Sequence, residues 1–311
     1  MSKHLFGIVV THHGTAANNR GETEGNITTL QKLLWHGEVH TTLSAESIRY
    51  AIRWYWQRSL DQKSKLNRSW DDKANAHTWT LPNFTEQSCS SFVDDDVMGF
   101  MSAKAGAEES NDAEAGQKKK RTRGTCDKRR ARLEITRAIS LTPFAGDITF
   151  NAASVGATPS ASSTGKDPVP YGTEIHATRY QYGFALTPEE LADKSRALLV
   201  LDAIANLNEV AGNHARFLFD YSPESIILRW TDDFAPRMLY GFALSADGKL
   251  AAPDVVARVK SGDIRADELI IGGSLAEHED VKALGVKLCP GVKAAVKEAK
   301  TRLSNDLGLT K

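Results

Sequence analysis

The stretch LFGIVVTHHGTAANNRGETEGN, residues 5–26, joins an apolar half to a polar half. The continuous apolar run at its start predicts a buried strand over residues 5–11. Residues 11–26 contain almost no side chains that could pack in a hydrophobic core, because they are mainly His, Gly, Asn, Thr and Glu. This composition predicts a long loop. So many hydrogen-bonding groups directly after a buried strand indicate that a polar ligand lies against it.

The next element outward is a helix that begins after Ser44. Ser44 is a good N-cap, and Glu46 places a negative charge in the first turn, where the helix dipole favours it. The helix has one apolar and one cationic face. Its core-facing positions, at helical spacing, are Ile48, Ala51, Ile52, Tyr55 and Trp56. A second stripe, at i, i+4 and i+8, consists of Arg49, Arg53 and Gln57.

Further along the chain, alternating apolar residues predict strands at 133–141 and 174–186. Thr187 is the expected N-cap of a helix that runs to about residue 210, and residues 215–230 supply one or two more strands. The order strand, helix, strand, strand, helix, strand is that of the ferredoxin-like fold, which RRM domains share. The predicted class is therefore α+β, with a ferredoxin-like or RRM-like body.

Two segments interrupt this body. Residues 61–132 are largely polar and predict an insertion, in which 104–125 is a mobile or partner-ordered loop. SFVDDDVMGFM, residues 91–101, predicts a strand or turn inside it. Residues 142–173 are rich in Gly, Pro, Ser and Ala and predict a long excursion between the two central strands. The predicted units are 1–60, 61–132, 133–141, 142–173 and 174–311.

The overall composition is that of an ordinary soluble globular chain. Of 311 residues, 41% are hydrophobic and 25% are charged, and the formal net charge is zero. No apolar run approaches the ~20 residues of a membrane span, and the first residues lack a signal-peptide pattern. The three cysteines lie far apart without a CxxC pair, which predicts a reducing cytoplasm, no disulfide and no zinc site.

The charges are unevenly distributed along the chain. Residues 86–114 hold eight acids and one base, whereas residues 118–137 hold ten bases and two acids. A partner experiences this local field, because salt screens charges over only ~8 Å. A net charge of zero therefore does not exclude a polyanionic partner.

Four motifs carry a resemblance to a known family. They are residues 11–56, DDDVMGFMSAKAG at 94–106, RLEITRAISLTPF at 132–144 and VPYGTEIHATRYQYGFAL at 169–186. Together they closely resemble the DevR-type backbone subunit of CRISPR Cascade complexes, the Cas seven family, and most of all its type I-B branch. The similarity covers most of residues 4–210 and weakens beyond 215.

The resemblance implies an RRM-derived palm, a fingers insertion at 61–132 and a thumb hairpin at 142–173. It implies that copies polymerise along one CRISPR guide RNA (crRNA), and that each thumb kinks this RNA so that the bases between kinks pair with target DNA. The implied partners are the guide RNA, target DNA, further copies of the chain and the handle-capping, large and small Cascade subunits. We expect no membrane partner and no cofactor, and the cysteine pattern predicts a cytoplasmic location.

A protein that holds any guide sequence contacts phosphates and sugars, not base edges. Arg, Lys and Asn side chains suit this task, as do backbone N–H groups that glycine leaves accessible. In the polar stretch these candidates are His13, Gly14, Asn18, Asn19, Arg20 and Gly21. The further candidates are Ser44, Arg49, Arg53, Lys104, Arg137, Val169, Pro170, Tyr171, Arg179 and Gln181.

Most of these positions have an ordinary structural alternative, which for the polar stretch 11–26 is a long surface loop. Arg49 and Arg53 form a solvated helix face in one interpretation, although like charges at i, i+4 repel by a few tenths of a kcal/mol unless an anion binds. Arg137 either pairs with a carboxylate or clamps a phosphate. Residues 169–171 are a rigid turn or a wedge between two stacked bases. The basic run 118–132 is a solvated loop or a guide for the target duplex or its displaced strand.

The strand 174–186 also offers aromatic candidates. Tyr180 and Tyr182 would stack on bases, as in an ordinary RRM. They share one side of the strand with Phe184, however, and this parity predicts core positions. Arg179 and Gln181, on the opposite side, are therefore the better RNA candidates.

Metal chemistry is the main competitor to RNA holding. The histidines that suggest a metal site are His12, His13, His36 and His40, but their spacing fits no zinc signature. Asp94, Asp95 and Asp96 suggest a metal-dependent ribonuclease. On a strand, consecutive side chains point to opposite faces, so the three cannot share one ion. Related type III subunits cut RNA with an Asp in a palm loop, and the matching stretch 11–26 has none, so we expect no enzymatic activity.

Overall fold

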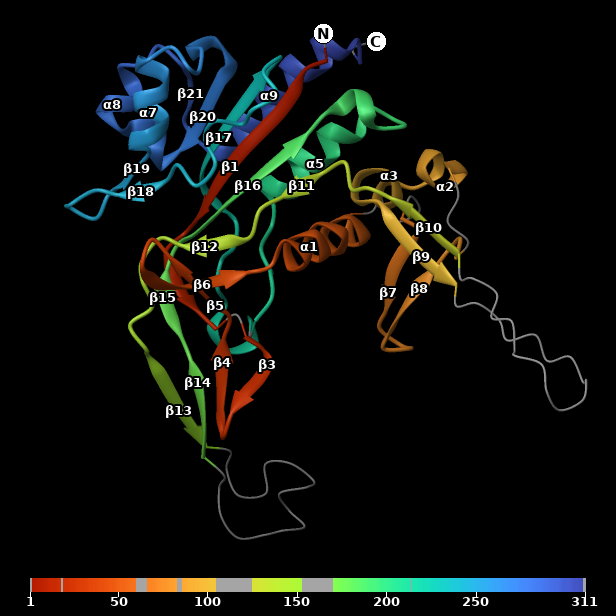
Figure 1. The fold of residues 1–311 in the computed structure, drawn as a ribbon, viewed down its shortest axis with the longest axis vertical. Helices are drawn as coiled ribbons and strands as arrows, with labels where there is room; N and C mark the ends of the chain where they lie inside the picture. The colour runs from red at the N-terminus through yellow and green to blue at the C-terminus, as the bar shows by residue number, and fades with distance from the viewer. Residues whose placement is uncertain are drawn as a thin grey trace, which may run out of the picture.

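The computed structural model describes residues 2–17, 19–59, 66–82, 86–104, 125–152, 170–212 and 214–309. Its fold is mixed α+β, with one large sheet and smaller sheets that project from it (Figure 1). The expected α+β class is confirmed. The predicted mobile loop lies outside the described residues except at its two ends, and so does most of the predicted excursion.

Strand β1 (His4–Thr11) lies in the middle of the large sheet, which has nine strands within the described residues. From edge to edge the order is β21 (Lys287–Cys289), β20 (Leu269–Gly273), β17 (Pro223–Thr231), β1, β16 (Tyr180–Leu186), β12 (Ala138–Ser140), β6 (Glu38–Leu43) and β5 (Lys32–Trp35), and β11 (Glu134–Ile135) also pairs with β16. The central strands β17, β1, β16 and β12 all run antiparallel to their neighbours. The strand predicted from the apolar run is confirmed.

The apolar run of β1 shows no alternation because both faces of the strand are buried. Leu5 and Val9 belong to the core on one face of the sheet. The core on the other face receives Phe6, Ile8 and Val10. Gly7 leaves room for the Phe184 ring, because a Cβ at this position would lie 2.2 Å from a ring carbon. A side chain at residue 7 would therefore displace the neighbouring strand's core aromatic.

Helices complete both cores. On the first face they are α1 (Ala45–Arg58), α5 (Arg196–Ala205) and α9 (Val292–Leu307), and on the second face α7 (Pro253–Lys260) and α8 (Glu279–Lys282) (Figure 1). The helix predicted after Ser44 is confirmed: the Ser44 hydroxyl accepts the Ser47 N–H at 3.2 Å. Short strands β18 (Ala243–Leu244) and β19 (Leu250–Ala251) pair beside α7.

The polar stretch after β1 is not the predicted loop. It forms β2 (Gly14–Ala16), β3 (Asn19–Glu24) and β4 (Ile27–Leu30). β2 pairs with β15 (His176–Thr178), and β4 pairs in parallel with β14 (Pro170–Glu174), which pairs with β13 (Ile148–Ala152). The resulting sheet, in the order β13-β14-β4-β3, projects from one end of the body (Figure 1). Local composition could not predict it, because the partner strand lies far along the chain.

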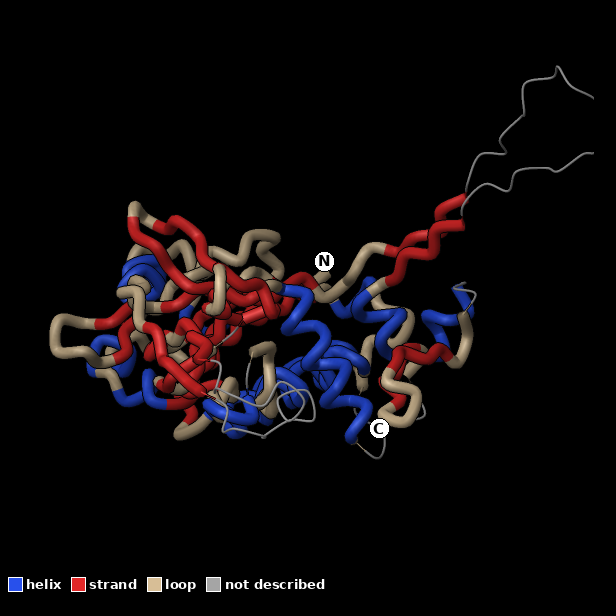
Figure 2. The backbone as a smooth tube through the Cα atoms, turned by 90° about the horizontal axis from the view of Figure 1, so that it is seen from below, coloured by secondary structure: helices blue, strands red, loops and turns tan. Residues whose placement is uncertain are grey.

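A second projection follows α1. It contains the hairpin of β7 (Arg68–Asp71) and β8 (Ala76–Trp79), helices α2 (Glu86–Ser91) and α3 (Val93–Met98), and the hairpin of β9 (Phe100–Lys104) and β10 (Thr125–Arg129). Figure 2 shows the β9–β10 hairpin pointing away from the body. The prediction of a strand or turn at 91–101 was wrong for most of that stretch, because α3 occupies its centre.

The strand predicted at 133–141 is interrupted. The Gly183 N–H on β16 donates to the Thr136 hydroxyl at 2.9 Å, instead of to a backbone carbonyl. This side-chain contact separates β11 from β12. Residues of one parity therefore do not keep facing the same side of the sheet across Thr136 and Arg137.

The helix predicted from Thr187 to about 210 is also interrupted. The Thr187 hydroxyl hydrogen-bonds to His4 Nδ1 at 2.7 Å, and only a 3-10 turn, η2 (Pro188–Glu190), follows it. The backbone N–H groups of Ala192 and Asp193 then donate to the buried Asp96 carboxylate. These tertiary contacts delay the helix until Arg196, where α5 begins.

Candidate nucleic-acid interface

The solvent face of α1 lines a groove of about 850 Å³. The opposite wall comes from β7 and from residues 209–212. The cationic and aromatic residues of the groove are Arg49, Tyr50, Arg53, Trp54, Arg68 and Trp70. Glu46, Asp72 and Glu209 also line it, so the charge is mixed. Cations beside aromatic rings suit a ligand that carries both phosphates and bases.

The three arginines of this groove are incompletely hydrogen-bonded within the protein. Arg53 Nε lies 3.5 Å from the buried Asp94 carboxylate, and Arg49 donates to the Leu133 carbonyl at 3.4 Å and lies 4.0 Å from Glu46. The Nε atoms of Arg49, Arg53 and Arg68 are buried without a hydrogen-bond partner in the part of the chain that the structure describes. Burial lowers the pKa of Arg53, Asp94 opposes this shift, and Arg68 adds to it. A bound anion would stabilise all three guanidinium groups.

The N-terminal end of α1 brings Ser44 and Arg137 near the same groove. Ser44 lines the groove while its hydroxyl caps the helix. Arg137 is exposed and donates to the Thr42 hydroxyl at 3.2 Å, not to a carboxylate. A backbone hydrogen bond lowers the pKa of Glu46 against the effect of burial, and Ser44, Arg49 and Arg137 add to the lowering. No described carboxylate lies within ion-pair distance of Arg137, and its role as a phosphate contact stays a prediction.

The candidates of the polar stretch are placed in different ways. His13 is exposed. Gly14, in β2, faces Phe219, whose ring carbon would lie 3.2 Å from a Cβ at residue 14. The small size of Gly14 therefore permits packing within the protein. The backbone of β3 carries Asn19, Arg20 and Gly21, and Asn18 lies outside the described residues.

Two candidates on β16 and just before it are engaged by other parts of the protein. Arg179 Nε lies 2.6 Å from the Glu224 carboxylate. Gln181 is 6% exposed, and its side-chain amide both donates to and accepts from the backbone of Phe242. The prediction that Gln181 contacts RNA is therefore wrong, because both ends of its amide are occupied. The core positions predicted for Tyr180 and Tyr182 are confirmed.

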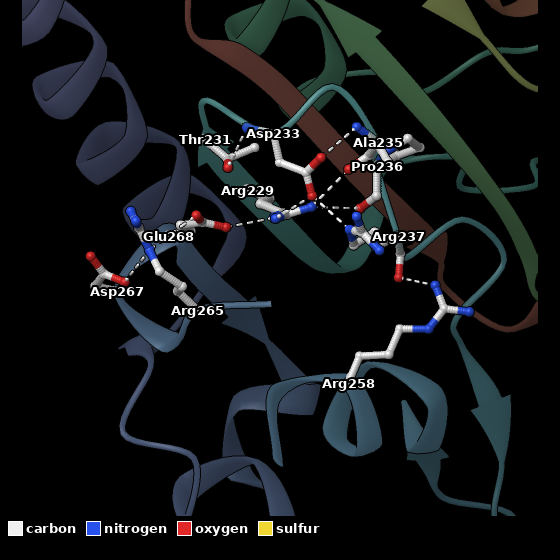
Figure 3. Close-up of polar contacts among 10 residues, drawn as sticks. All are labelled: Arg229, Thr231, Asp233, Ala235, Pro236, Arg237, Arg258, Arg265, Asp267 and Glu268. Atoms are coloured by element: carbon white, nitrogen blue, oxygen red, sulfur yellow. Dashed lines mark hydrogen bonds and ion pairs between the residues drawn. The ribbon is translucent and has the colours of Figure 1, made fainter. Parts of the chain in front are cut away.

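The segment 232–242 covers Gln181, and the buried Arg229 holds that segment in place. Figure 3 shows Arg229 donating Nε to Glu268 at 2.7 Å and reaching both Asp233 and backbone carbonyls of the segment. Arg237 also binds Asp233, and its hydrogen bond is the main cause of a strongly lowered Asp233 pKa. Sequence parity placed Gln181 correctly opposite the tyrosines, but it carried no sign that this second face was covered.

The remaining candidates lie on the two projections. Pro170 and Tyr171 begin β14, and Val169 lies outside the described residues. The Arg216 guanidinium, from α6 (His214–Phe217), lies 4.8 Å from the centre of the Tyr171 ring. Lys104 ends β9, opposite Thr125 on the other projection. The structure therefore gathers Ser44, Arg49 and Arg53 at one groove and places the hairpin candidates and Lys104 elsewhere.

The three consecutive carboxylates lie on α3 and are all buried. The argument from strand alternation was therefore wrong, because the segment is helical. Their partners are the backbone of Asn67 and Arg68 for Asp94, the Asn67 side chain for Asp95, and Arg129 and Arg196 for Asp96. Burial, followed by the neighbouring Asp94, raises the pKa of Asp95 to about 6. The described residues contain no group of three His, Cys, Asp or Glu that could hold a metal ion.

Sequence reasoning missed the opposite wall of the groove and the partner of Tyr171. Arg68 and Trp70 stand two residues apart on β7, so their alternation was a usable signal inside a stretch treated only as an insertion. Arg216 had no such signal, because its position depends on how the segment after α5 folds back. None of the described helices is both long and apolar enough to cross a membrane.

A model of the family described as CRISPR-associated negative auto-regulator DevR/Csa2 matches residues 8–238. The chain belongs to this family. A DevR relative from Myxococcus xanthus (strain DK1622), described as CRISPR-associated protein Cas7/Cst2/DevR, is 50% identical over 313 residues, covering 97% of this chain and 98% of the relative. The family resemblance drawn from the four sequence motifs is confirmed.

Two solved structures are similar in fold to this DevR-family chain. A chain of a CRISPR RNA-guided surveillance complex in a pre-nicking state matches with a TM-score of 0.61, and a chain of another CRISPR RNA-guided surveillance complex matches with 0.57. Each is 11% identical, and each match covers 96% of this chain and 99% of the other. At this identity the similarity concerns the fold.

Proposed function

We propose that this chain is a crRNA-binding backbone subunit of a type I CRISPR surveillance (Cascade) complex. Copies polymerise along one guide RNA and present it for pairing with target DNA, beside the handle-capping, large and small subunits. Membership of the DevR/Csa2 family and the likeness to chains of RNA-guided surveillance complexes support this function. The proposed role is structural, without an enzymatic step or a cofactor, and its setting is the cytoplasm.

The architecture supports dividing the chain into palm, fingers and thumb. The central order β17-β1-β16-β12, with α1 and α5 on one face, follows the antiparallel 4-1-3-2 order of a ferredoxin-like or RRM-like palm. The projection that contains β7 to β10 then corresponds to the fingers. The sheet with β13 and β14 corresponds to the thumb, with β3 and β4 added from the polar stretch.

The observation that carries the proposal is the cationic groove on α1. Arg49, Arg53 and Arg68 line a groove that Trp54 and Trp70 also line, and their buried Nε atoms have no hydrogen-bond partner within the residues that the structure describes. Guanidinium groups bind phosphate oxygens without reading the base. This is the chemistry that a protein needs when its guide sequence varies from one complex to the next.

Filter binding of two unrelated guide RNAs across a salt series tests this function. Arg49→Ala and Arg68→Ala should weaken binding equally for both RNAs. Each lost phosphate contact should also flatten the slope of log affinity against log salt by ~0.7, the single-strand value per phosphate. Arg265→Ala, which removes an exposed arginine with a 63% exposed side chain from outside the groove, is the matched control. Failure of the wild-type protein to bind either RNA would refute the proposal.

A metal-dependent ribonuclease on the same scaffold was the alternative function. The carboxylates that suggested it are engaged by Asn67, Arg68, Arg129 and Arg196, and no observation among the described residues favours cleavage. An RNA-cleavage assay with magnesium compares the wild-type protein with Asp95→Ala. Cleavage that requires the metal and disappears in the variant would establish the ribonuclease instead.

A further inference from the structure

The hairpin of β13 and β14 has two chemically different faces. Residues directly opposite each other in an antiparallel pair project to the same side. On one side the register therefore gathers Thr149, Asn151, Tyr171 and Thr173. On the other side, Ile148 and Phe150 are 38% and 76% exposed. The first side is polar and faces the segment that follows α5, because Arg216 of that segment contacts Tyr171.

The position of Arg216 is fixed by its own segment and by the aromatic ring beneath it. Phe219 packs edge-on against Tyr180 at 5.8 Å, and the Tyr221 N–H donates to the Asn208 carbonyl at 3.1 Å. These contacts hold α6 beside the hairpin. The Arg216 guanidinium lies 4.8 Å from the Tyr171 ring centre, while the residue as a whole is exposed. A planar cation thus lies over an aromatic ring in an exposed residue, where its N–H groups can reach a ligand.

Asn151 supplies an independent observation at the same place. It stands directly opposite Tyr171 across the hairpin. Its Nδ2 atom is buried and has no hydrogen-bond partner among the residues described. A buried donor without an acceptor costs free energy of folding, so a ligand that supplies an acceptor would recover that cost. The guanidinium, the amide and the phenol hydroxyl all offer donors, and together they select a ligand rich in acceptor oxygens.

We infer that Arg216, Asn151 and Tyr171 form a nucleotide subsite next to Ala152 and Pro170, the last described pair of the hairpin. A phosphate lies against the guanidinium of Arg216, and Asn151 Nδ2 donates to an acceptor of the ribose or base of the same nucleotide. Tyr171 holds the guanidinium in place through its ring. This inference rests on the proposed RNA-binding function and adds Arg216 and Asn151, from the chain segments after α5 and in β13, to the RNA surface.

Salt-dependent filter binding with one guide RNA tests the subsite. Arg216→Ala should weaken binding roughly tenfold, since a hydrogen bond to a charged group is worth at least one power of ten. It should also flatten the salt slope by ~0.7, the loss of one phosphate contact. Arg265→Ala again removes the same charge from an exposed position elsewhere. If Arg216→Ala and Arg265→Ala have the same RNA affinity and the same salt slope, the inference is overturned.

The sign of the response at Asn151 gives a second test. Asn151→Asp replaces a donor by a negative charge, so it should weaken RNA binding more than Asn151→Ala does. Tighter or unchanged binding by Asn151→Asp would mean that no acceptor-rich ligand lies there.

Tyr171→Phe keeps the ring under Arg216 and should bind within about threefold of wild type, whereas Tyr171→Leu should resemble Arg216→Ala. Equal affinity of the Phe and Leu variants would overturn the positioning role of Tyr171.

Two controls separate this inference from the proposed function. A thermal melt of each variant confirms that loss of binding is not loss of folding. If the wild-type protein binds no RNA, the proposed function fails. If the wild-type protein binds RNA and Arg49→Ala weakens it while Arg216→Ala and Asn151→Asp do not, only the subsite fails.

Discussion

Arg49 and Arg53 share one face of α1, but their environments differ. The side chain of Asp94 is 1% exposed and lies beside Arg53, whereas Glu46, the partner of Arg49, is 81% exposed. Arg53→Ala leaves a buried carboxylate with only backbone donors, so it should lower the free energy of unfolding by about 1–3 kcal/mol. Arg49→Ala should change it by less than about 0.5 kcal/mol. Urea denaturation of both variants measures the difference.

The cost at Arg53 should disappear when Asp94 loses its charge. In an Asp94→Asn background, Arg53→Ala should therefore cost distinctly less than in the wild-type protein. An identical cost in both backgrounds would mean that Arg53 contributes through packing of its stem and not through the ion pair.

Asp95 makes stability depend on pH in the direction opposite to most carboxylates. Burial raises its pKa from 3.8 to about 6 in the folded protein, so the folded state binds this proton more tightly than the unfolded state. The contribution of Asp95 to stability is complete below pH 4 and is lost as the pH rises through 6. Asp95→Asn, which cannot ionise, should thus gain stability relative to wild type by about 1–3 kcal/mol between pH 4 and pH 7. Denaturation midpoints of both proteins at several pH values measure this gain. A stability difference between the two proteins that does not change with pH would contradict it.

At the scale of elements, Asp96 connects the second projection to the body. It lies on α3, pairs with Arg129 of β10 and Arg196 of α5, and accepts two backbone N–H groups of the segment before α5. Asp96→Asn removes the charge partner of Arg129 and leaves the buried Arg196 only Asp193, at 3.9 Å, so it should cost about 3–5 kcal/mol. Limited proteolysis should then cut the projection sooner than in wild type. Asp280→Asn, at an exposed position, is the control, and equal proteolysis rates for the two variants would contradict the link.

Local signals predicted the elements whose causes are local. The apolar run of β1 and the capped, amphipathic α1 were found because spacing and capping residues act within a few positions. The strands at 19–30 were missed because their partner β14 is remote in sequence, and the break before α5 was missed because it depends on Asp96. Likewise, Arg49 and Arg53 were found by helical spacing, whereas Arg216 meets Tyr171 only in the folded chain.

At the scale of the whole molecule, the two projections lie at different places on one body (Figure 1). Contact between unlike surfaces of two copies is heterologous and propagates as a helix instead of closing. We expect the purified protein to be polydisperse without RNA and to form assemblies of defined size with a guide RNA. Light scattering and analytical ultracentrifugation measure this distribution. A strictly monomeric protein in both conditions would contradict it.

The central place of β1 has a consequence for synthesis on the ribosome. Its two neighbours in the sheet, β16 and β17, end at Leu186 and Thr231, so the first strand leaves the ribosome long before either partner exists. At translation rates of 5–20 residues per second, the delay from Thr11 to Thr231 is on the order of 10–40 s. During that time five large apolar side chains cannot pack into either hydrophobic core. They are Leu5, Phe6, Ile8, Val9 and Val10. The nascent chain therefore needs protection, by a chaperone or by transient local structure, until most of the protein has been made.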